Sequence, residues 1–298
     1  MPESSNYIGQ EDNSLLELPI DKEIIFSDHK GNYSKKVEKR ETKLLKKVVF
    51  IKPFLKKDEK IILVTNGCSP ISVMEQLVTG AVLLVYLKRC FFIFTNKRIF
   101  HIPTTKDFVY RNSIAVISYG DCQNIAIKNW QMEIKYKNGK KERFIYIPGK
   151  DRKKIRALVQ KGTLIAEQTK TMGRGHICPR CATDLVQNEY VCPNCQLEFK
   201  NLAKAKKTSI LYPGGGYFYT GHLYLGIVDA FVETFLTIVV ILTFIAGLMG
   251  EEGAIGAFVF YTVIFIIEKL VSVYHSTHFV EEYIPLEKEI TPINATQQ

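Results

Sequence analysis

Two long uncharged segments near the end of the chain limit its architecture more than any other feature. Residues 235 to 250 carry no charged side chain, and neither do residues 253 to 267. Extended into their flanks, each gives the roughly 20 apolar residues that a helix needs to cross about 30 Å of hydrocarbon. Only Glu251 and Glu252 add charge between them, and neither segment offers the polar outer face of a soluble helical hairpin. The sequence therefore predicts a transmembrane helical hairpin.

The charge of the chain divides close to the start of this membrane region. Residues 1 to 207 have a net charge of +17, and residues 208 to 298 have a net charge of −7. Positively charged flanks stay in the cytoplasm. We therefore expect a multi-pass protein of the inner (cytoplasmic) membrane, with both termini cytoplasmic. The polar, acidic start of the sequence has no apolar core of a signal peptide. The lysines that set this orientation precede the first predicted span: Lys200, Lys204, Lys206 and Lys207.

Four cysteines before the membrane region have the spacing of a metal site. Cys178 and Cys181 form one Cys-x-x-Cys pair, and Cys192 and Cys195 form a second pair ten residues later. Two short knuckles let four thiolates face one point, as tetrahedral Zn²⁺ requires. A redox dithiol or four ordinary buried cysteines are the alternatives, but a redox motif normally occurs singly. Four cysteines fill the coordination shell, so we predict structural zinc rather than a catalytic centre.

Residues 176 to 200 resemble a zinc ribbon of the rubredoxin-knuckle type. The resemblance implies a small hairpin clipped by one metal ion. The remaining cysteines, Cys68, Cys90 and Cys122, are odd in number and have no disulfide framework spacing. Together with the paired cysteines they favour a reducing compartment for the soluble part of the chain.

Short strands dominate residues 42 to 168. Met132, Ile134 and Tyr136 alternate with charged residues, which is typical of a half-buried strand. Asn138-Gly139 then predicts a type I′ hairpin turn. An amphipathic helix follows from Asp151 to about residue 167. These patterns predict an antiparallel β-barrel or sandwich that ends in a helix.

This arrangement resembles the pleckstrin-homology superfold in its bacterial and GRAM-like versions. The resemblance rests on the segment Phe54–Ile61 and on the strand–Thr-Asn-Lys-Arg–strand hairpin Phe92–Ile99. It implies a domain that binds lipid headgroups, a peptide or another copy of the chain. Within this region, the apolar run from Gly80 to Leu87 is too short to span a membrane, and we expect a buried strand there. The expected headgroup contacts are Lys88, Arg89, Lys97 and Arg98.

A glycine-rich segment precedes the first predicted span. It is similar to a family of small two-helix membrane domains marked by Gly-Gly, then Phe-Tyr-x-Gly, then a further Gly before a long apolar helix. That family lends this chain no biochemical activity. A phosphate-binding loop is disfavoured, because no strand precedes the glycines and no Walker lysine follows them. The matching positions are Gly214, Gly215, Phe218, Tyr219, Gly221 and Gly226.

Two acidic residues lie inside the first predicted span. Asp229 and Glu233 are four residues apart, so they share one helix face. Ionisable residues within a membrane segment are candidate functional groups. The simpler alternative, which we favour, is that both reach the interface or cap a backbone donor of the loop from Gly214 to Tyr219.

The predicted organisation has five parts, listed here in chain order: a flexible N-terminal arm (1–41), a pleckstrin-homology-like domain (42–168), a linker and zinc ribbon (169–200), a two-helix transmembrane domain with its glycine-rich loop (201–280), and a cytoplasmic tail (281–298).

The sequence contains no Gly-x-Ser-x-Gly, His-Glu-x-x-His or kinase signature. We therefore expect a non-enzymatic membrane-surface scaffold or sensor. Its expected partners are the bilayer and either a protein partner or further copies of the chain. The first alternative is nucleic-acid association through the ribbon and a basic patch, although the ribbon itself carries few basic residues. The second is an oligomeric transport or proton-relay component built on Asp229 and Glu233.

Overall fold

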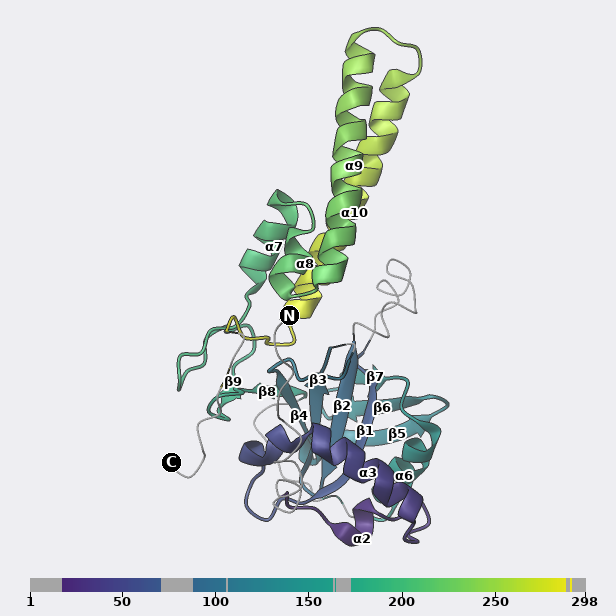
Figure 1. Ribbon diagram of the computed structural model, residues 1–298, viewed down its shortest axis with the longest axis vertical. Helices are drawn as coiled ribbons and strands as arrows, with labels where there is room; N and C mark the ends of the chain where they lie inside the picture. Colours follow the sequence, from purple (N-terminus) through teal and green to yellow (C-terminus); the bar gives the residue numbers. More distant parts are fainter. Residues whose placement is uncertain are drawn as a thin grey trace, which may run out of the picture. The chain divides into compact units, whose positions relative to one another are not determined.

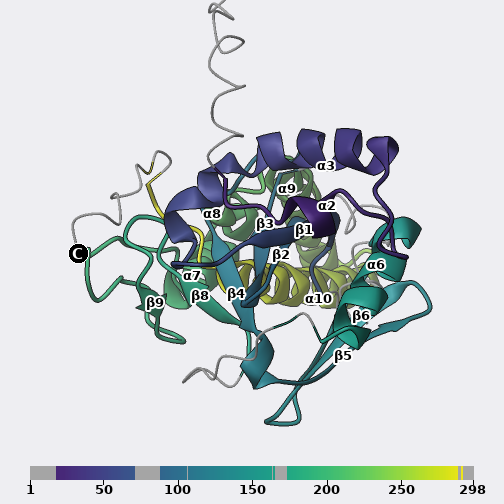
Figure 2. The same cartoon turned by 90° about the horizontal axis from the view of Figure 1, so that it is seen from below.

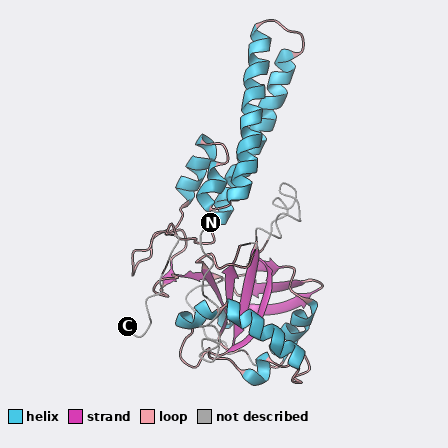
Figure 3. Ribbon diagram, viewed as in Figure 1, coloured by secondary structure: helices cyan, strands magenta, loops and turns pink. Residues whose placement is uncertain are grey.

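The computed structural model describes residues 18–70, 88–105, 107–162, 164, 173–287 and 290. The chain divides into two compact units. The first contains Met1–Gln196 with Glu289–Gln298, and the second contains Leu197–Lys288. Figures 1 and 3 show that the first unit is built on β-strands and that the second is helical. We describe each unit separately. The expected strand from Gly80 to Leu87 lies outside the described residues.

The first unit is organised around an antiparallel six-stranded sheet. Phe92 and Phe94 point into one core, whereas Phe91 and Ile93 point into a second core on the other face. Because the sheet is covered on both faces, its strands form continuous apolar runs rather than alternating ones. The strands, in spatial order, are β1 (Ile61–Cys68), β2 (Arg89–Thr95), β3 (Arg98–Pro103), β4 (Ile114–Ser118), β8 (Gly175–Ile177) and β9 (Asp184–Leu185).

A three-stranded antiparallel sheet and helix α6 (Gly149–Gln160) cover the first face. The strands of this sheet are β5 (Cys122–Lys128), β6 (Gln131–Tyr136) and β7 (Lys141–Phe144). The three alternating apolar residues of β6 are fully buried, as predicted. An isolated bridge between Cys68 and Ile145 connects the two sheets, and the described strands form no closed barrel.

The turn between β6 and β7 differs from the predicted type I′ turn. That turn requires positive φ at both central residues, but of Asn138 and Gly139 only Gly139 has a positive φ, at 86°. Lys135 pairs with Lys141, and the Tyr136 N–H bonds to the Lys140 carbonyl. The connection is therefore longer than two residues, with glycine in the one left-handed position.

Helices α2 (Lys22–Ile25), α3 (Lys35–Lys47) and the 3₁₀ helix η1 (Val49–Phe54) belong to the second face of the six-stranded sheet. Figure 2 shows α3 on one side of β1–β4 and the β5–β6 strands with α6 on the other. Here the structure corrects the expected flexible arm over its described part. Leu18 and Ile25 are buried in the second core. These apolar residues are too widely spaced to give a periodic signal, so the sequence pattern alone did not reveal them.

The second unit is a helical hairpin with two shorter helices at its base. Helices α9 (Leu223–Leu248) and α10 (Ala254–Val280) pack against each other, and α7 (Leu202–Leu211) and α8 (Gly215–Thr220) pack beside them (Figure 1). Little of the most apolar stretch of either long helix is buried inside the structure. Apolar side chains that face outward along their length are typical of lipid-exposed helices. Both helices are thus long and apolar enough to span a membrane.

Candidate functional sites

The four paired cysteines meet at one point in the first unit. Two equivalent knuckles bring them together. The Cys178 carbonyl accepts from the Ala182 N–H, and the Cys192 carbonyl accepts from the Gln196 N–H. In each knuckle the residue after the second cysteine has a positive φ, 59° at Ala182 and 56° at Gln196. The repeated backbone pattern turns both sulfurs of a pair to the same side, as the sequence spacing predicted.

The sulfur positions fit a tetrahedral metal ion. Cys178 Sγ lies 3.5 Å from Cys195 Sγ, and Cys181 Sγ lies 3.5 Å from Cys192 Sγ. All four sulfurs are within 4.8 Å of one another. Zinc–thiolate bonds of about 2.3 Å in tetrahedral geometry place sulfurs about 3.8 Å apart. The hydroxyl of Thr183 lies 3.3 Å from Cys181 Sγ and can support that ligand. The cluster can therefore hold one metal ion in an all-sulfur shell.

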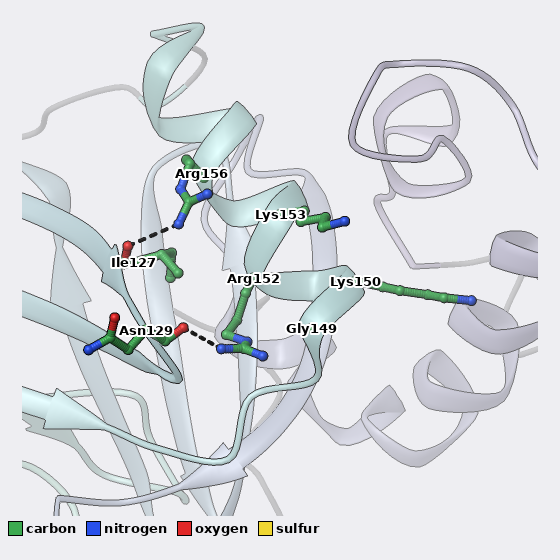
Figure 4. A pocket seen from close by; sticks show the side chains of 7 residues that line it. All are labelled: Ile127, Asn129, Gly149, Lys150, Arg152, Lys153 and Arg156. Atoms are coloured by element: carbon green, nitrogen blue, oxygen red, sulfur yellow. Dashed lines mark hydrogen bonds between the residues drawn. The ribbon is translucent and has the colours of Figure 1, made fainter.

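A basic cavity of about 470 Å³ lies where the first turns of α6 face the β5–β6 connection. Figure 4 shows Arg152 and Arg156 turned toward the β5–β6 connection and bonded to backbone carbonyls, whereas Lys150 and Lys153 extend from the other side of the helix. Arg152 donates to the Asn129 carbonyl, and Arg156 donates to the Ile127 carbonyl at 3.1 Å. Among the described residues no acidic side chain lines the cavity; its described lining is Ile127, Asn129, Gly149, Lys150, Arg152, Lys153 and Arg156.

The backbone adds to the positive potential of this cavity. Gly149 and Lys150 are the first residues of α6, where unpaired N–H groups and the helix dipole favour anions. Lys150 and Lys153 also line a second cavity of about 500 Å³, to which α3 contributes Lys36 and Arg40. The basic surface therefore extends from α6 to α3. We refer to the first cavity as the α6 pocket. The sequence pattern predicted an amphipathic helix here, but it did not predict that the helix would line a cavity.

The headgroup contacts expected from the sequence lie elsewhere. Arg98 is paired with the buried carboxylate of Glu59 at 3.0 Å and donates to the Phe54 carbonyl at 2.7 Å. Lys88 is buried and donates to the Pro70 carbonyl at 3.1 Å. Both side chains therefore make intramolecular contacts that stabilise the fold.

Arg89 and Lys97 also lie outside the α6 pocket. The Arg89 guanidinium stacks 5.0 Å from the Phe108 ring. Lys97 lies in the tight turn between β2 and β3, and its N–H bonds to the Thr95 hydroxyl. None of the four expected residues lines the α6 pocket, which has a different set of basic residues.

A buried serine–histidine contact superficially resembles a nucleophile and its base. Ser69 Oγ lies 2.8 Å from His101 Nε2, and an Arg174 nitrogen lies 3.2 Å from His101 Nδ1. Arg174 can only donate, so Nδ1 accepts and Nε2 carries the proton that is donated to Ser69. Burial holds the pKa of His101 well below its usual range. In this tautomer the imidazole cannot take a proton from the serine.

The glycine-rich motif of the second unit acts through close packing. Gly214 has a φ of 65°, and a Cβ there would lie 2.1 Å from the Gly226 carbonyl oxygen. A Cβ on Gly215 would lie 2.3 Å from the Thr208 carbonyl oxygen. These contacts hold α8 against α7 and α9. The motif residues therefore need to be small for steric reasons.

The other motif residues complete the same packing. A Cβ on Gly226 would meet the Phe218 ring at 2.6 Å, so that ring lies directly on the α9 backbone. The Tyr219 hydroxyl accepts from the Asn201 N–H, which begins α7. Gly221 ends α8 with a φ of 83°. In the described structure these residues therefore serve helix packing.

Asp229 and Glu233 face the helices at the base of the hairpin. Glu233 accepts from the Gly214 N–H at 3.1 Å, so the predicted capping of a loop donor is confirmed for this residue. Glu233 also pairs with Lys269 of α10 at 2.7 Å. Asp229 accepts from the Ser272 hydroxyl at 3.1 Å. The sequence did not reveal these α10 partners, because only helix pairing brings them to α9.

Comparisons with known proteins give no relative for this chain. No family model matches it, and neither the curated proteins nor the solved structures contain a match. The functional argument therefore rests on the residues and contacts described above.

Proposed function

We propose that this chain is a membrane-anchored, non-enzymatic protein whose first unit binds anionic lipid headgroups in the α6 pocket. The observation that carries the proposal is the pocket itself. Four basic residues and the first turn of α6 line one cavity, and the described lining includes no acidic residue, in a chain with two helices able to span a membrane. Well-placed basic residues gain about 1 kcal/mol each near an anionic leaflet.

The architecture of the first unit supports the pleckstrin-homology-like part of the proposal. Strands β1–β7 of the two antiparallel sheets are followed by one amphipathic helix, α6, whose Ile155 and Leu158 complete the core. On this proposal the ligand contacts are Lys150, Lys153 and the two arginines of α6, rather than Lys88, Arg89, Lys97 and Arg98. Arginine forks suit phosphate oxygens geometrically.

The four cysteines have a supporting role in this proposal. A closed shell of sulfur ligands favours a structural Zn²⁺ ion. The ion fixes the ribbon, whose strand β8 is paired with β4 of the main sheet. The ribbon would thus be a rigid element immediately before the membrane unit, and its zinc would take no part in a reaction.

The membrane orientation follows from charge. The four lysines before α9 favour the cytoplasmic side, and the connection with Glu251 and Glu252 would lie outside. The α6 pocket would then be on the same side as the inner leaflet, which is the anionic one in this setting.

The test uses Trp130, the single tryptophan of the chain. Its side chain is exposed, and the Arg152 guanidinium lies 5.7 Å from its ring. Full-length protein is reconstituted into nanodiscs of phosphatidylcholine, with or without a fraction of phosphatidylglycerol. We expect the anionic discs to protect Trp130 from acrylamide quenching. The protection should fall strongly in the Lys150→Ala, Lys153→Ala double variant.

The matched control is the Lys137→Ala, Lys141→Ala double variant, which removes the same charge at the other end of the β6–β7 hairpin. It should keep the protection. Equal quenching in both kinds of disc, or equal loss in both variants, would contradict headgroup binding at the α6 pocket. Protection by inorganic phosphate or by a short single-stranded DNA instead of anionic discs would assign the pocket to a free anion or to nucleic acid.

A further inference from the structure

We propose that Asp229, Glu233 and Glu268 form a binding site for a divalent metal cation at the base of the membrane hairpin. Glu268 belongs to α10, whereas the other two belong to α9. Each residue offers a carboxylate oxygen within 4.8 Å of the other two. Oxygens that far apart can be bridged by a hard cation with metal–oxygen bonds of about 2.4 Å.

With all three carboxyl groups ionised, the charges of the site are unbalanced without a cation. Three negative charges would then face Lys269, the one basic residue paired with them among the described contacts. The resulting charge of about −2 lies between helices that the bilayer surrounds, where uncompensated charge is costly. A divalent cation would neutralise it.

The hydrogen bonding leaves ligand atoms available. Glu233 is fully buried, and its Oε2 already accepts from Lys269 and from the Gly214 N–H. Its Oε1 has no partner among the residues that the structure describes, and neither does Glu268 Oε2. A buried carboxylate oxygen without a donor is expensive. Coordination to a metal would satisfy it.

The surrounding contacts fix the ligands in place. The Ser272 hydroxyl donates to Asp229, and Lys269 donates to the Ser209 carbonyl of α7 at 2.9 Å. All ligands are oxygens, which selects Mg²⁺, Mn²⁺ or Ca²⁺ over zinc. The site is therefore chemically distinct from the sulfur cluster, and it would join α9 to α10 through one ion.

The experiment titrates Mn²⁺ into zinc-loaded full-length protein in neutral detergent, after removal of other metals on a chelating resin. Electron paramagnetic resonance measures free Mn²⁺. We expect about one saturable Mn²⁺ per chain, displaced by excess Mg²⁺ or Ca²⁺. Glu268→Gln and Asp229→Asn should each weaken binding at least about tenfold. Glu251→Gln, in the loop between the helices, is the matched control and should bind like the original protein.

Folding is checked by helical circular dichroism, by zinc content and by a single elution peak, so that a loss of binding reports the site. Saturable Mn²⁺ binding that is unchanged in both ligand variants would overturn the proposal. So would an absence of saturable binding in a folded protein. Infrared detection of a protonated carboxyl group that disappears in Glu268→Gln, without Mn²⁺ binding, would assign the cluster to a shared proton instead.

Discussion

Glu59 shows how a short motif can mark structure rather than a binding surface. Its carboxylate is buried and accepts from the Thr95 hydroxyl at 2.8 Å, from Arg98 and from the Lys56 N–H. Asn96 donates to the Asp58 carbonyl in the same region. The Thr-Asn-Lys-Arg sequence thus closes the β2–β3 turn and ties it to the segment before β1. Its arginine belongs to the fold.

This network predicts very different results for two neighbouring basic residues. Arg98→Ala removes the partner of a buried carboxylate and should cost roughly 3–5 kcal/mol of stability. Lys97→Ala leaves the Arg98–Glu59 pair in place and should cost much less, on the order of 0.5 kcal/mol. Chemical unfolding of the full chain, followed by circular dichroism, measures both. Similar losses for the two variants would show that the Glu59 network contributes little.

At the scale of single elements, local pattern predicted strands β2, β3 and β6. The period of two in β6 and the apolar run in β2 are direct consequences of one-sided and two-sided burial. Non-local pairing was beyond such patterns. The α6 pocket forms where Asn129 of the β5–β6 connection meets Arg152, 23 residues later, and Glu268 lies beside α9 only when the hairpin closes. The spacing of apolar residues along the chain predicts neither of these two contacts.

The cysteine knuckles give a second prediction at this scale. Cys178→Ser should abolish stoichiometric zinc, because serine replaces one of four sulfur ligands. Cys122→Ser is the control, since Cys122 lies in β5 and outside the cluster. Elemental analysis measures the zinc. Hydrogen exchange should rise in β8 and β9 of Cys178→Ser while β1–β3 remain protected. Full zinc content in that variant would mean that the ligands are misassigned.

Packing of α8 predicts a sharp difference between two glycines of the membrane unit. Gly214→Ala combines a left-handed backbone with a clash against the Gly226 carbonyl, and should cost about 2–4 kcal/mol. Gly256 has open space where a Cβ would stand, so Gly256→Ala should change stability by less than about 1 kcal/mol. Thermal unfolding in detergent compares them. A tolerated Gly214→Ala would contradict the close approach of α8 and α9.

Across the whole molecule, the two units bury their apolar residues in different surroundings. The first unit packs its phenylalanines and isoleucines into two cores around one sheet. The second unit leaves most apolar side chains of α9 and α10 facing outward. The charge of the chain changes near the start of α9, with a net charge of +17 over residues 1 to 207 and of −7 over residues 208 to 298. The average composition of the chain shows neither the difference in apolar burial nor the change in net charge. Both become visible when the residues are followed along the sequence.

The charge division makes a prediction about orientation. With basic residues concentrated before α9, the first unit should be cytoplasmic and the α9–α10 connection external. Cysteines are introduced singly as Glu251→Cys in that connection and Gln187→Cys in the ribbon, and intact cells are treated with a membrane-impermeant maleimide. Glu251→Cys should be labelled in intact cells, whereas Gln187→Cys should be labelled only after lysis. The native cysteines all precede α9, so they should add no label before lysis. The reverse pattern would place the first unit outside and would remove the inner leaflet as the partner of the α6 pocket.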